Sequence, residues 1–296
     1  MSSRKPPYIL QELPDINESI RFPLKNVQRI KYTCFDVSKT LIVFGATSGG
    51  IYIFNRHPCE FLQLIPNKDG TITRVVISTD EKYVGFANGR GIVIVTACDQ
   101  SVSGSNSAVT SKEHLNNEVT ALAWSMRNML FCGDDVGKIS VLQLKNFIAK
   151  TMFQNSSQTI MSLDSRICQI DVKESMLLVS TFTRCYICDT SQEQYRQIGQ
   201  KLRDGEFGAC FFNKENHLDN VTQTHEEVTE FKQYNIVDNG TGFASSKTLT
   251  NTLIFCARPS SRLWEATVDG TVIRTHQYKH VLAKKVYEYI VNRKLQ

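Results

Sequence analysis

Apolar residues occur along this chain in short runs, and the runs recur in sets of three separated by polar turns. In the first set, the run 30–37 is followed by 41–46 and, after a glycine turn, by 51–54. Short apolar runs bounded by Gly, Ser, Asn and Asp are typical of β-strands and too short for most helices. The first set therefore predicts three consecutive strands joined by tight turns.

The same set recurs along the chain, which predicts a repeat architecture. The equivalent turns lie at Gly50, Gly91, Gly137 and Arg184, in steps of 41, 46 and 47 residues. One four-stranded propeller blade takes roughly 40–45 residues. The predicted strands of the later sets are 74–78, 83–87 and 92–95; 119–124, 129–133 and 138–142; 167–172, 176–180 and 185–188; and 207–212, 253–257, 262–266 and 271–275.

These repeats predict an all-β protein, a degenerate WD40-like β-propeller with about five recognisable blades and a short C-terminal helix. The second strand of each set is almost continuously apolar, as expected for a strand covered on both faces. The Gly-His and Trp-Asp pairs of regular WD repeats are missing from these copies, so we expect their His–Asp hydrogen-bond network to be largely absent. Propellers usually have 4–8 blades, which leaves a short ring, or a fragment or truncated isoform of a longer propeller protein.

The pattern divides the chain into three parts: an N-terminal segment, 1–29; the propeller, 30–277; and a basic helical tail, 278–296. Within the propeller, the polar stretch 213–251 interrupts the fifth repeat and predicts a disordered surface insertion. In the tail, the helical spacing of Leu282, Val286, Tyr289 and Ile290 predicts the helix.

Charge is concentrated in the tail. The formal net charge is +5, from 34 basic and 29 acidic residues. Four of these net charges lie after Gln277, so the propeller itself is nearly neutral. A nearly neutral body argues against a nucleic-acid-binding surface spread over the fold. The tail could bind an anionic membrane or an acidic partner, or it could be a solvated end.

The nine cysteines are odd in number and lack framework spacing, and the first residues contain no apolar signal-peptide core. We therefore expect free thiols in a cytosolic protein. No apolar run approaches the roughly 18 residues of a membrane helix, so membrane association is expected to be peripheral.

Two motifs have metal-ligand spacing. Cys185 and Cys188 form a Cys-x-x-Cys pair, but residues three apart in a strand point to opposite faces, so they are expected to be core cysteines. His276 and His280 have the spacing of ligands on a helix but lack the Glu of a zinc protease, and are expected to be surface histidines.

The remaining polar motifs are expected to be turns. Asp134 and Asp135 precede Gly137 in a position of ordinary turn chemistry. Ser48-Gly-Gly50 and Gly89-Arg-Gly91 resemble phosphate loops, but no helix follows them, and hairpin turns with positive φ fit better. We therefore predict no catalytic, cofactor-binding or metal site, no small-molecule substrate and no enzymatic activity, and we leave binding residues unassigned.

Local sequence in the last third carries a family resemblance. Asp204-Gly-Glu-Phe-Gly-Ala-Cys-Phe-Phe212, Phe255-Cys-Ala-Arg-Pro-Ser-Ser-Arg-Leu-Trp-Glu265 and Thr275-His-Gln-Tyr-Lys279 resemble the Hermansky-Pudlak syndrome 5 family. Val119-Thr-Ala-Leu-Ala-Trp124 and Ser180-Thr-Phe-Thr-Arg184 fit the same amino-terminal propeller, so the resemblance covers roughly residues 30–279.

The resemblance implies a non-catalytic scaffold subunit of the biogenesis of lysosome-related organelles complex 2, a cytosolic trafficking assembly peripheral to endosomal membranes. The implied partners are the Hermansky-Pudlak syndrome 3 and 6 proteins and Rab-family GTPases. Members of the family are much longer than this chain, which is expected to be their amino-terminal part.

A second family is also similar. The tectonin β-propeller repeat protein 2 of autophagy and endoplasmic-reticulum exit shares Phe207-Gly-Ala-Cys210 and Arg258-Pro259. The two interpretations agree on a binding role. In both, we expect an apolar patch around Phe211, Phe212 and Trp264 to serve packing, with recognition on the loops.

Overall fold

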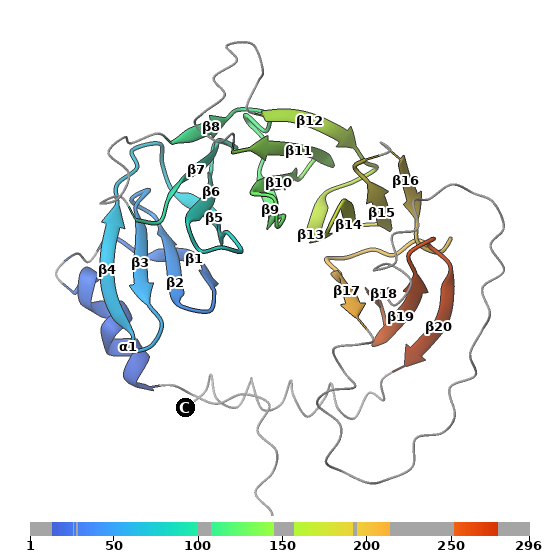
Figure 1. The fold of residues 1–296 in the computed structure, drawn as a ribbon, viewed down its shortest axis with the longest axis horizontal. Coiled ribbons are helices and arrows are strands. Elements are labelled where there is room, and N and C mark those ends of the chain that lie inside the picture. Colours follow the sequence, from blue (N-terminus) through green and yellow to red (C-terminus); the bar gives the residue numbers. More distant parts are fainter. Residues whose placement is uncertain are drawn as a thin grey trace, which may run out of the picture. The chain divides into compact units, whose positions relative to one another are not determined.

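The fold consists of five four-stranded antiparallel sheets in a computed structural model (Figure 1). The structure describes residues 14–25, 27, 29–99, 108–144, 157–191, 194–213 and 252–277. Each sheet is built from four strands that follow one another in the chain. Such a meander forms because short apolar runs joined by tight turns pair with their immediate neighbours.

The strands have the following bounds. The first sheet is β1 (Tyr32–Val37), β2 (Leu41–Ala46), β3 (Ile51–Asn55) and β4 (Glu60–Ile65). The second is β5 (Ile72–Ile77), β6 (Tyr83–Asn88), β7 (Val93–Ala97) and β8 (Val109–Ser111), and the third is β9 (Val119–Trp124), β10 (Met129–Asp134), β11 (Lys138–Gln143) and β12 (Ser157–Ser162). The fourth is β13 (Ile167–Lys173), β14 (Met176–Thr181), β15 (Cys185–Asp189) and β16 (Gln194–Gln197), and the fifth is β17 (Ala209–Asn213), β18 (Thr252–Arg258), β19 (Arg262–Thr267) and β20 (Val272–Gln277). Before the sheets lie one α-helix, α1 (Pro14–Arg21), and one 3-10 turn, η1 (Phe22–Leu24).

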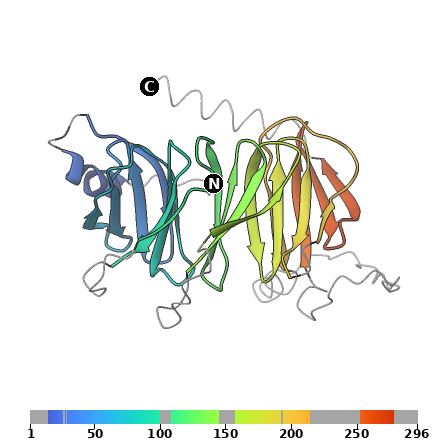
Figure 2. The same ribbon diagram turned by 90° about the horizontal axis from the view of Figure 1, so that it is seen from above.

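The chain divides into two compact units, which are described separately below. The first unit comprises residues 1–135 and 139–161, and the second comprises 136–138 and 162–296. The first, second and third sheets are therefore almost wholly in the first unit, and the fourth and fifth sheets are in the second. Within each sheet, all four strands stand side by side (Figure 2).

In the first unit, neighbouring sheets pack face to face through aliphatic side chains. Val43, Ile51 and Ile53 of the first sheet meet Val75 and Phe86 of the second in one buried cluster. The other face of the second sheet packs on the third sheet in a separate cluster. A sheet covered on both faces needs apolar residues at consecutive positions, and β6 has this pattern.

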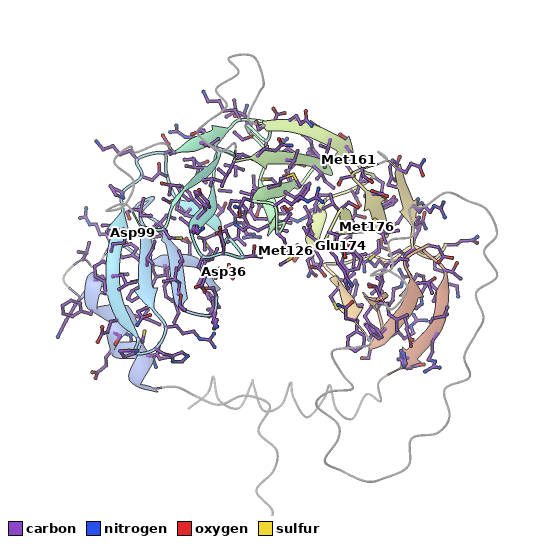
Figure 3. All side chains as sticks on the ribbon, in the orientation of Figure 1. Asp36, Asp99, Met126, Met161, Glu174 and Met176 are labelled. Carbon is purple, nitrogen blue, oxygen red and sulfur yellow. The ribbon has the colours of Figure 1, made fainter. Side chains whose placement is uncertain are left out.

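Polar side chains fix the inner strands of the first unit to one another. Asp36 on β1 (Figure 3) accepts a hydrogen bond of 2.8 Å at Oδ2 from the backbone N–H of Ile77 on β5. From the third sheet, the indole N–H of Trp124 donates to the carbonyl oxygen of Val76 at 3.2 Å. These bonds fix the neighbouring sheets more specifically than apolar packing alone would.

The second unit repeats this scheme. Cys185, Ile187, Ile254 and Cys256 belong to one buried cluster that joins the fourth and fifth sheets. The carboxylate Oδ2 of Asp171 on β13 accepts the backbone N–H of Phe211 at 2.9 Å. A carboxylate of the inner strand therefore binds the inner strand of the next sheet in both units.

Every predicted strand is present, with ends shifted by one or two residues. The sequence pattern did not identify β4, β8, β12 and β16, the last strands of their sheets, nor the helix α1. The predicted tail helix at 278–296 and the inserted residues 214–251 lie outside the described part of the chain.

Candidate functional site

His114, which precedes β9, is the centre of a buried polar network in the first unit. Its Nδ1 lies 2.8 Å from Oδ2 of Asp134, at the end of β10, and its Nε2 lies 2.7 Å from Oγ of Ser140 on β11. All three residues are buried. Because buried polar groups need partners, the network fixes the loop before β9 to the β10–β11 hairpin.

The turn between β6 and β7 lies against the same loop. Gly91 has φ +78°, and a Cβ there would lie 1.9 Å from the carbonyl oxygen of His114. Both the backbone angle and the close approach therefore require glycine. Gly49 and Gly137, at the equivalent turns, also have positive φ, which confirms the prediction of hairpin turns at these positions.

The expectation that His–Asp networks would be largely absent is wrong for the third sheet. The Gly-His pair is indeed missing, because Glu113 precedes His114, but the histidine itself and its aspartate are present. The second network residue, Asp134, had been assigned to turn chemistry together with Asp135. Asp135 lies in the turn after β10, but its side chain also binds outside the turn, accepting the backbone N–H of Glu118 at 3.0 Å.

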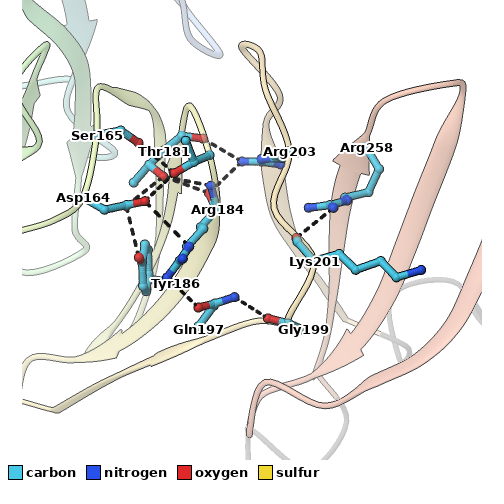
Figure 4. A network of polar contacts seen from close by, with 11 residues as sticks. Asp164, Ser165, Thr181, Arg184, Tyr186, Gln197, Gly199, Lys201, Arg203 and Arg258 are labelled. Atoms are coloured by element: carbon cyan, nitrogen blue, oxygen red, sulfur yellow. Dashed lines mark hydrogen bonds and ion pairs between the residues drawn. The ribbon is translucent and has the colours of Figure 1, made fainter.

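A larger polar network lies in the second unit (Figure 4). Oδ1 of Asp164 accepts the hydroxyls of Tyr186 at 3.0 Å and Thr181 at 3.3 Å, and Oδ2 accepts the hydroxyl of Thr183. The guanidinium Nε of Arg184 lies 3.8 Å from Asp164 Oδ2. Asp164 therefore holds the β14–β15 turn to the segment before β13.

Two buried arginines join the fourth and fifth sheets to the segment 198–208 between them. Arg203 donates from Nη1 to the carbonyl of Ala257 at 2.8 Å, and from Nη2 to the carbonyls of Thr181 and Arg184 at 3.1 and 3.0 Å. Arg258 donates from Nη2 to the carbonyls of Lys201 and Leu202 at 2.9 and 2.7 Å. Its guanidinium lies 3.9 Å above the ring of Trp264, a favourable cation–π distance.

The Cys185 thiol lies beside these arginines and is paired with Cys256. The hydrogen bond from Cys256 and the positive charges of Arg203 and Arg258 lower the pKa of Cys185, and the same pairing raises the pKa of Cys256. Cys188 is also buried, but it does not belong to this cluster. Burial raises its pKa to about 12. The prediction of two core cysteines is confirmed, whereas the pairing of Cys185 with Cys256 was not foreseen.

Of the other sequence-predicted residues, Trp264 contacts these networks through Arg258. His276 is on strand β20, where its Nε2 lies 2.8 Å from Glu265 Oε2, and His280 is outside the described residues. Phe211 and Trp264 pack on the buried cluster of the second unit. Phe212 instead contacts Phe255, with ring centroids 5.4 Å apart. The expected single patch of Phe211, Phe212 and Trp264 is therefore wrong, because neighbouring strand residues point to opposite faces.

Neither a metal site nor a membrane span emerges from the described ranges. They contain no group of three or more His, Cys, Asp or Glu side chains that could hold a metal ion. No helix within them is long and apolar enough to cross a membrane. The polar clusters that are present are occupied by hydrogen bonds between parts of the fold.

The face of the first sheet that points away from the second sheet is a partly open apolar surface. Its rings form a continuous set of contacts with centroid separations of 4.5–6.3 Å. Phe35 and Val37 on β1 remain 65% and 43% exposed. We call this surface the aromatic face; it consists of Tyr32, Phe35, Val37, Ile42, Phe44, Tyr52, Phe54 and Phe61.

Solved structures with a similar fold define the class of protein. The WD40 repeats of RRP9 match with a TM-score of 0.54 and 13% identity, over 84% of this chain and 64% of that one. U3-55K matches with a TM-score of 0.54 and 12% identity, over 84% of this chain and 65% of that one. Together with the five sheets, these likenesses identify a degenerate WD40-like β-propeller.

The sequence comparisons identify the family. The family model described as "HPS5 beta-propeller" matches residues 10–226, and the chain belongs to this family. It is 38% identical over 278 residues to the "BLOC-2 complex member HPS5 homolog" of Drosophila melanogaster, covering 93% of this chain and 30% of that protein. It is 32% identical over 285 residues to the "BLOC-2 complex member HPS5" of Homo sapiens, covering 93% of this chain and 22% of that protein. The chain thus spans about a third or less of the length of these relatives.

The second family named by the sequence is also similar, but more distantly. The "Tectonin beta-propeller repeat-containing protein 2" of Homo sapiens is 30% identical over 274 residues, covering 89% of this chain and 17% of that protein. The preference for the Hermansky-Pudlak syndrome 5 family is confirmed.

Proposed function

We propose that this chain is a non-catalytic scaffold subunit of a BLOC-2-type complex. The observation that carries the proposal is the similarity to relatives named as BLOC-2 complex members, which extends over more than nine-tenths of the chain. In this role it would bind the Hermansky-Pudlak syndrome 3 and 6 proteins, with Rab-family GTPases as further partners. The complex would act in the cytosol, peripheral to endosomal membranes, and deliver cargo to pigment granules and other lysosome-related organelles.

The described structure supports a binding role physically. His114, Asp134 and Asp164 are occupied by hydrogen bonds within the fold. The turns between strands are held in defined positions, as at Gly91. Rigid sheets that present fixed loops and an open apolar face suit the docking of other proteins.

An autophagy adaptor remains the second candidate, on the single observation of 30% identity to the tectonin relative. The two functions differ in their partners. A BLOC-2-type subunit would bind the other two subunits of that complex, whereas an adaptor would bind ubiquitin-like autophagy proteins.

The test is co-expression of the tagged chain with the Hermansky-Pudlak syndrome 3 and 6 proteins, followed by affinity purification and quantification of each subunit. The controls are the same chain ending at Gln277 and a tagged WD40 propeller of another family. We expect both subunits to be recovered in fixed ratio with this chain and not with the unrelated propeller. Recovery of ubiquitin-like autophagy proteins instead would favour the second candidate, and recovery of chaperones alone would refute both.

A further inference from the structure

Two free thiols of the second unit, Cys185 and Cys256, meet across the contact between the fourth and fifth sheets. Cys185 lies on β15 and Cys256 on β18, and both are buried in the cluster that joins the two sheets. Side chains alternate between the two faces of a strand, which is why Ile187 shares this cluster with Cys185 and Cys188 does not. The two sulfur atoms are close enough for the Cys256 thiol to donate a hydrogen bond to Cys185.

Arg203 holds the two backbones together beside these thiols. Its Nη2 donates to the carbonyl of Arg184 at 3.0 Å, and its Nη1 donates to the carbonyl of Ala257 at 2.8 Å. Arg184 directly precedes Cys185, and Ala257 directly follows Cys256. One planar guanidinium therefore fixes the approach of the two segments that carry the thiols. Close approach without backbone movement is the main geometric requirement for a disulfide.

The two thiols differ in how readily they lose a proton. The hydrogen bond from Cys256 and the nearby guanidinium groups of Arg203 and Arg258 lower the pKa of Cys185. The hydroxyl of Ser180, whose Oγ lies 3.4 Å from Cys185 Sγ, acts in the same direction. The hydrogen bond to Cys185 and burial raise the pKa of Cys256. Because the thiolate is the nucleophilic form of cysteine, Cys185 has the character of the attacking sulfur and Cys256 that of its partner.

The charge around the pair also favours a thiolate at Cys185. In the described part of the chain, the hydrogen bonds from Arg203 and Arg258 end on neutral backbone carbonyls, and neither guanidinium forms an ion pair with a carboxylate. Buried positive charge without a carboxylate stabilises any negative charge that develops beside it. The thiolate of Cys185 supplies such a charge.

We propose that Cys185 and Cys256 form an oxidation site, which a small peroxide converts into a disulfide between the fourth and fifth sheets and a dithiol reduces again. Both sulfurs are buried, so the oxidant has to be as small as hydrogen peroxide. Disulfides of this reversible kind are the ones found in reducing compartments. The inference goes beyond the proposed function and does not depend on it.

The oxidation takes two steps. First, the Cys185 thiolate attacks one oxygen of hydrogen peroxide, the O–O bond breaks, hydroxide leaves, and Cys185 becomes a sulfenic acid. The negative charge that helped to raise the pKa of Cys256 is then gone, and the hydroxide takes the Cys256 proton to form water. Second, the Cys256 thiolate attacks the Cys185 sulfur, the S–O bond breaks, and the S–S bond forms. The departing hydroxide takes up the proton that Cys185 first released, so two thiols lose two electrons and one peroxide becomes two waters.

The test uses the full chain with Cys188→Ala, because Cys185 is then the only cysteine of the tryptic peptide 185–196. The reduced protein is treated with hydrogen peroxide, its remaining thiols are blocked with iodoacetamide in urea, and its tryptic peptides are analysed by mass spectrometry without reduction. Cys256 lies in the peptide 248–262. Half-buried Cys168, which also interacts with Cys185, lies in the peptide 167–173. Cys132 is the matched control, because it is buried and its pKa is raised to about 12.

We expect a disulfide between the peptides 185–196 and 248–262, which dithiothreitol removes, and oxidation of Cys132 that is slower by about tenfold or more. Adding Cys256→Ala should stop the reaction at a sulfenic acid on Cys185, which dimedone labels. Adding Cys185→Ala should leave Cys256 reduced. Circular dichroism checks that each variant is folded, and if a further variant does not fold, the disulfide in the Cys188→Ala chain decides the question.

Three results would overturn the inference. One is the absence of the disulfide at peroxide concentrations that oxidise the exposed thiol of Cys210. Another is a disulfide between the peptides 185–196 and 167–173, which would make Cys168 the partner of Cys185. The third is oxidation of Cys132 as fast as that of Cys185, which would mean that only unfolded chains react. Because the assay contains no complex subunit, its failure is distinct from failure of the co-expression experiment.

Discussion

Replacing Asp134 by Ala removes the acceptor at the centre of the His114 network. In the native fold, Asp134 Oδ2 lies 2.8 Å from His114 Nδ1 and accepts from Asn117 Nδ2 at 3.3 Å. Asp134 and His114 are both fully buried, so water does not readily replace the lost partner. The substitution therefore leaves a buried imidazole without the acceptor that orients it.

The expected loss in the free energy of unfolding follows from the two hydrogen bonds that Asp134 makes to His114 and Asn117. A hydrogen bond to a charged group contributes about 1.5–3 kcal/mol, and one between neutral groups about 1 kcal/mol. Asp134→Ala should therefore lower the free energy of unfolding by about 3 kcal/mol or more. Ser140→Ala, which removes the 2.7 Å contact to His114 Nε2 and a weak hydrogen bond to the Cys132 thiol, should cost about 1 kcal/mol.

The assay is urea unfolding followed by tryptophan fluorescence. The chain has two tryptophans, and a Trp264→Phe background leaves Trp124, in the same unit as the network, as the reporter. Free energies come from linear extrapolation of the transition. Asp135→Ala is the control, because this neighbouring carboxylate binds the Glu118 N–H at an exposed position and its loss should cost less than about 1 kcal/mol.

A loss for Asp134→Ala no larger than that for Ser140→Ala would refute the reasoning. It would mean that the aspartate does not orient His114, or that water reaches the site. An equally large effect of Asp135→Ala would show that the turn, rather than the network, determines stability.

Three further predictions concern the backbone, the arginines and the thiols. Gly91→Ala should lower the free energy of unfolding by more than Gly70→Ala, because both residues have positive φ but only a Cβ at position 91 would collide with a carbonyl; urea unfolding monitored by Trp124 compares them. Arg203→Met should cost about 3 kcal/mol in the second unit, since it removes three buried hydrogen bonds to backbone carbonyls; Trp264 fluorescence, in a Trp124→Phe background, measures the loss, and a cost under about 1 kcal/mol would contradict it. Burial raises the pKa of three thiols from an ordinary 9.0 to about 12. The stability that these thiols contribute is therefore complete below pH 9 and should be lost as the pH rises from 9 to 12. Urea unfolding midpoints should fall less steeply across this range in Cys132→Ala, and an unchanged slope would show that the buried thiols are not the cause. These thiols are Cys98, Cys132 and Cys188.

Strands buried on both faces could be predicted, whereas outer strands could not. Continuous apolar runs such as Tyr83–Ala87 are a strong signal because neighbouring sheets cover both faces. The outer strand β16, Gln194–Gln197, is largely polar and half exposed, so its sequence resembles that of a loop. Pairing with β15 makes it a strand, and tertiary pairing of this kind leaves little trace in a local pattern.

The polar networks were missed for a different reason: their members are distant in sequence. His114 and Asp134 are 20 residues apart, and the family's usual dipeptide signals are absent. The one available signal was a lone histidine about 20 residues before an aspartate that ends an apolar strand. Cys185 and Cys256 lie on different sheets, with the long polar insertion between them in sequence, so only the fold reveals their pairing.

The arginines of the second unit determine how that unit responds to acid. Most buried cations in proteins are paired with carboxylates, which lose their charge when the pH falls below about 4. The hydrogen bonds from Arg203 and Arg258 to the backbone end on carbonyl oxygens, which do not titrate in that range. The connection between the fourth and fifth sheets should therefore keep these hydrogen bonds in acidic surroundings where ion pairs between carboxylates and cations are lost.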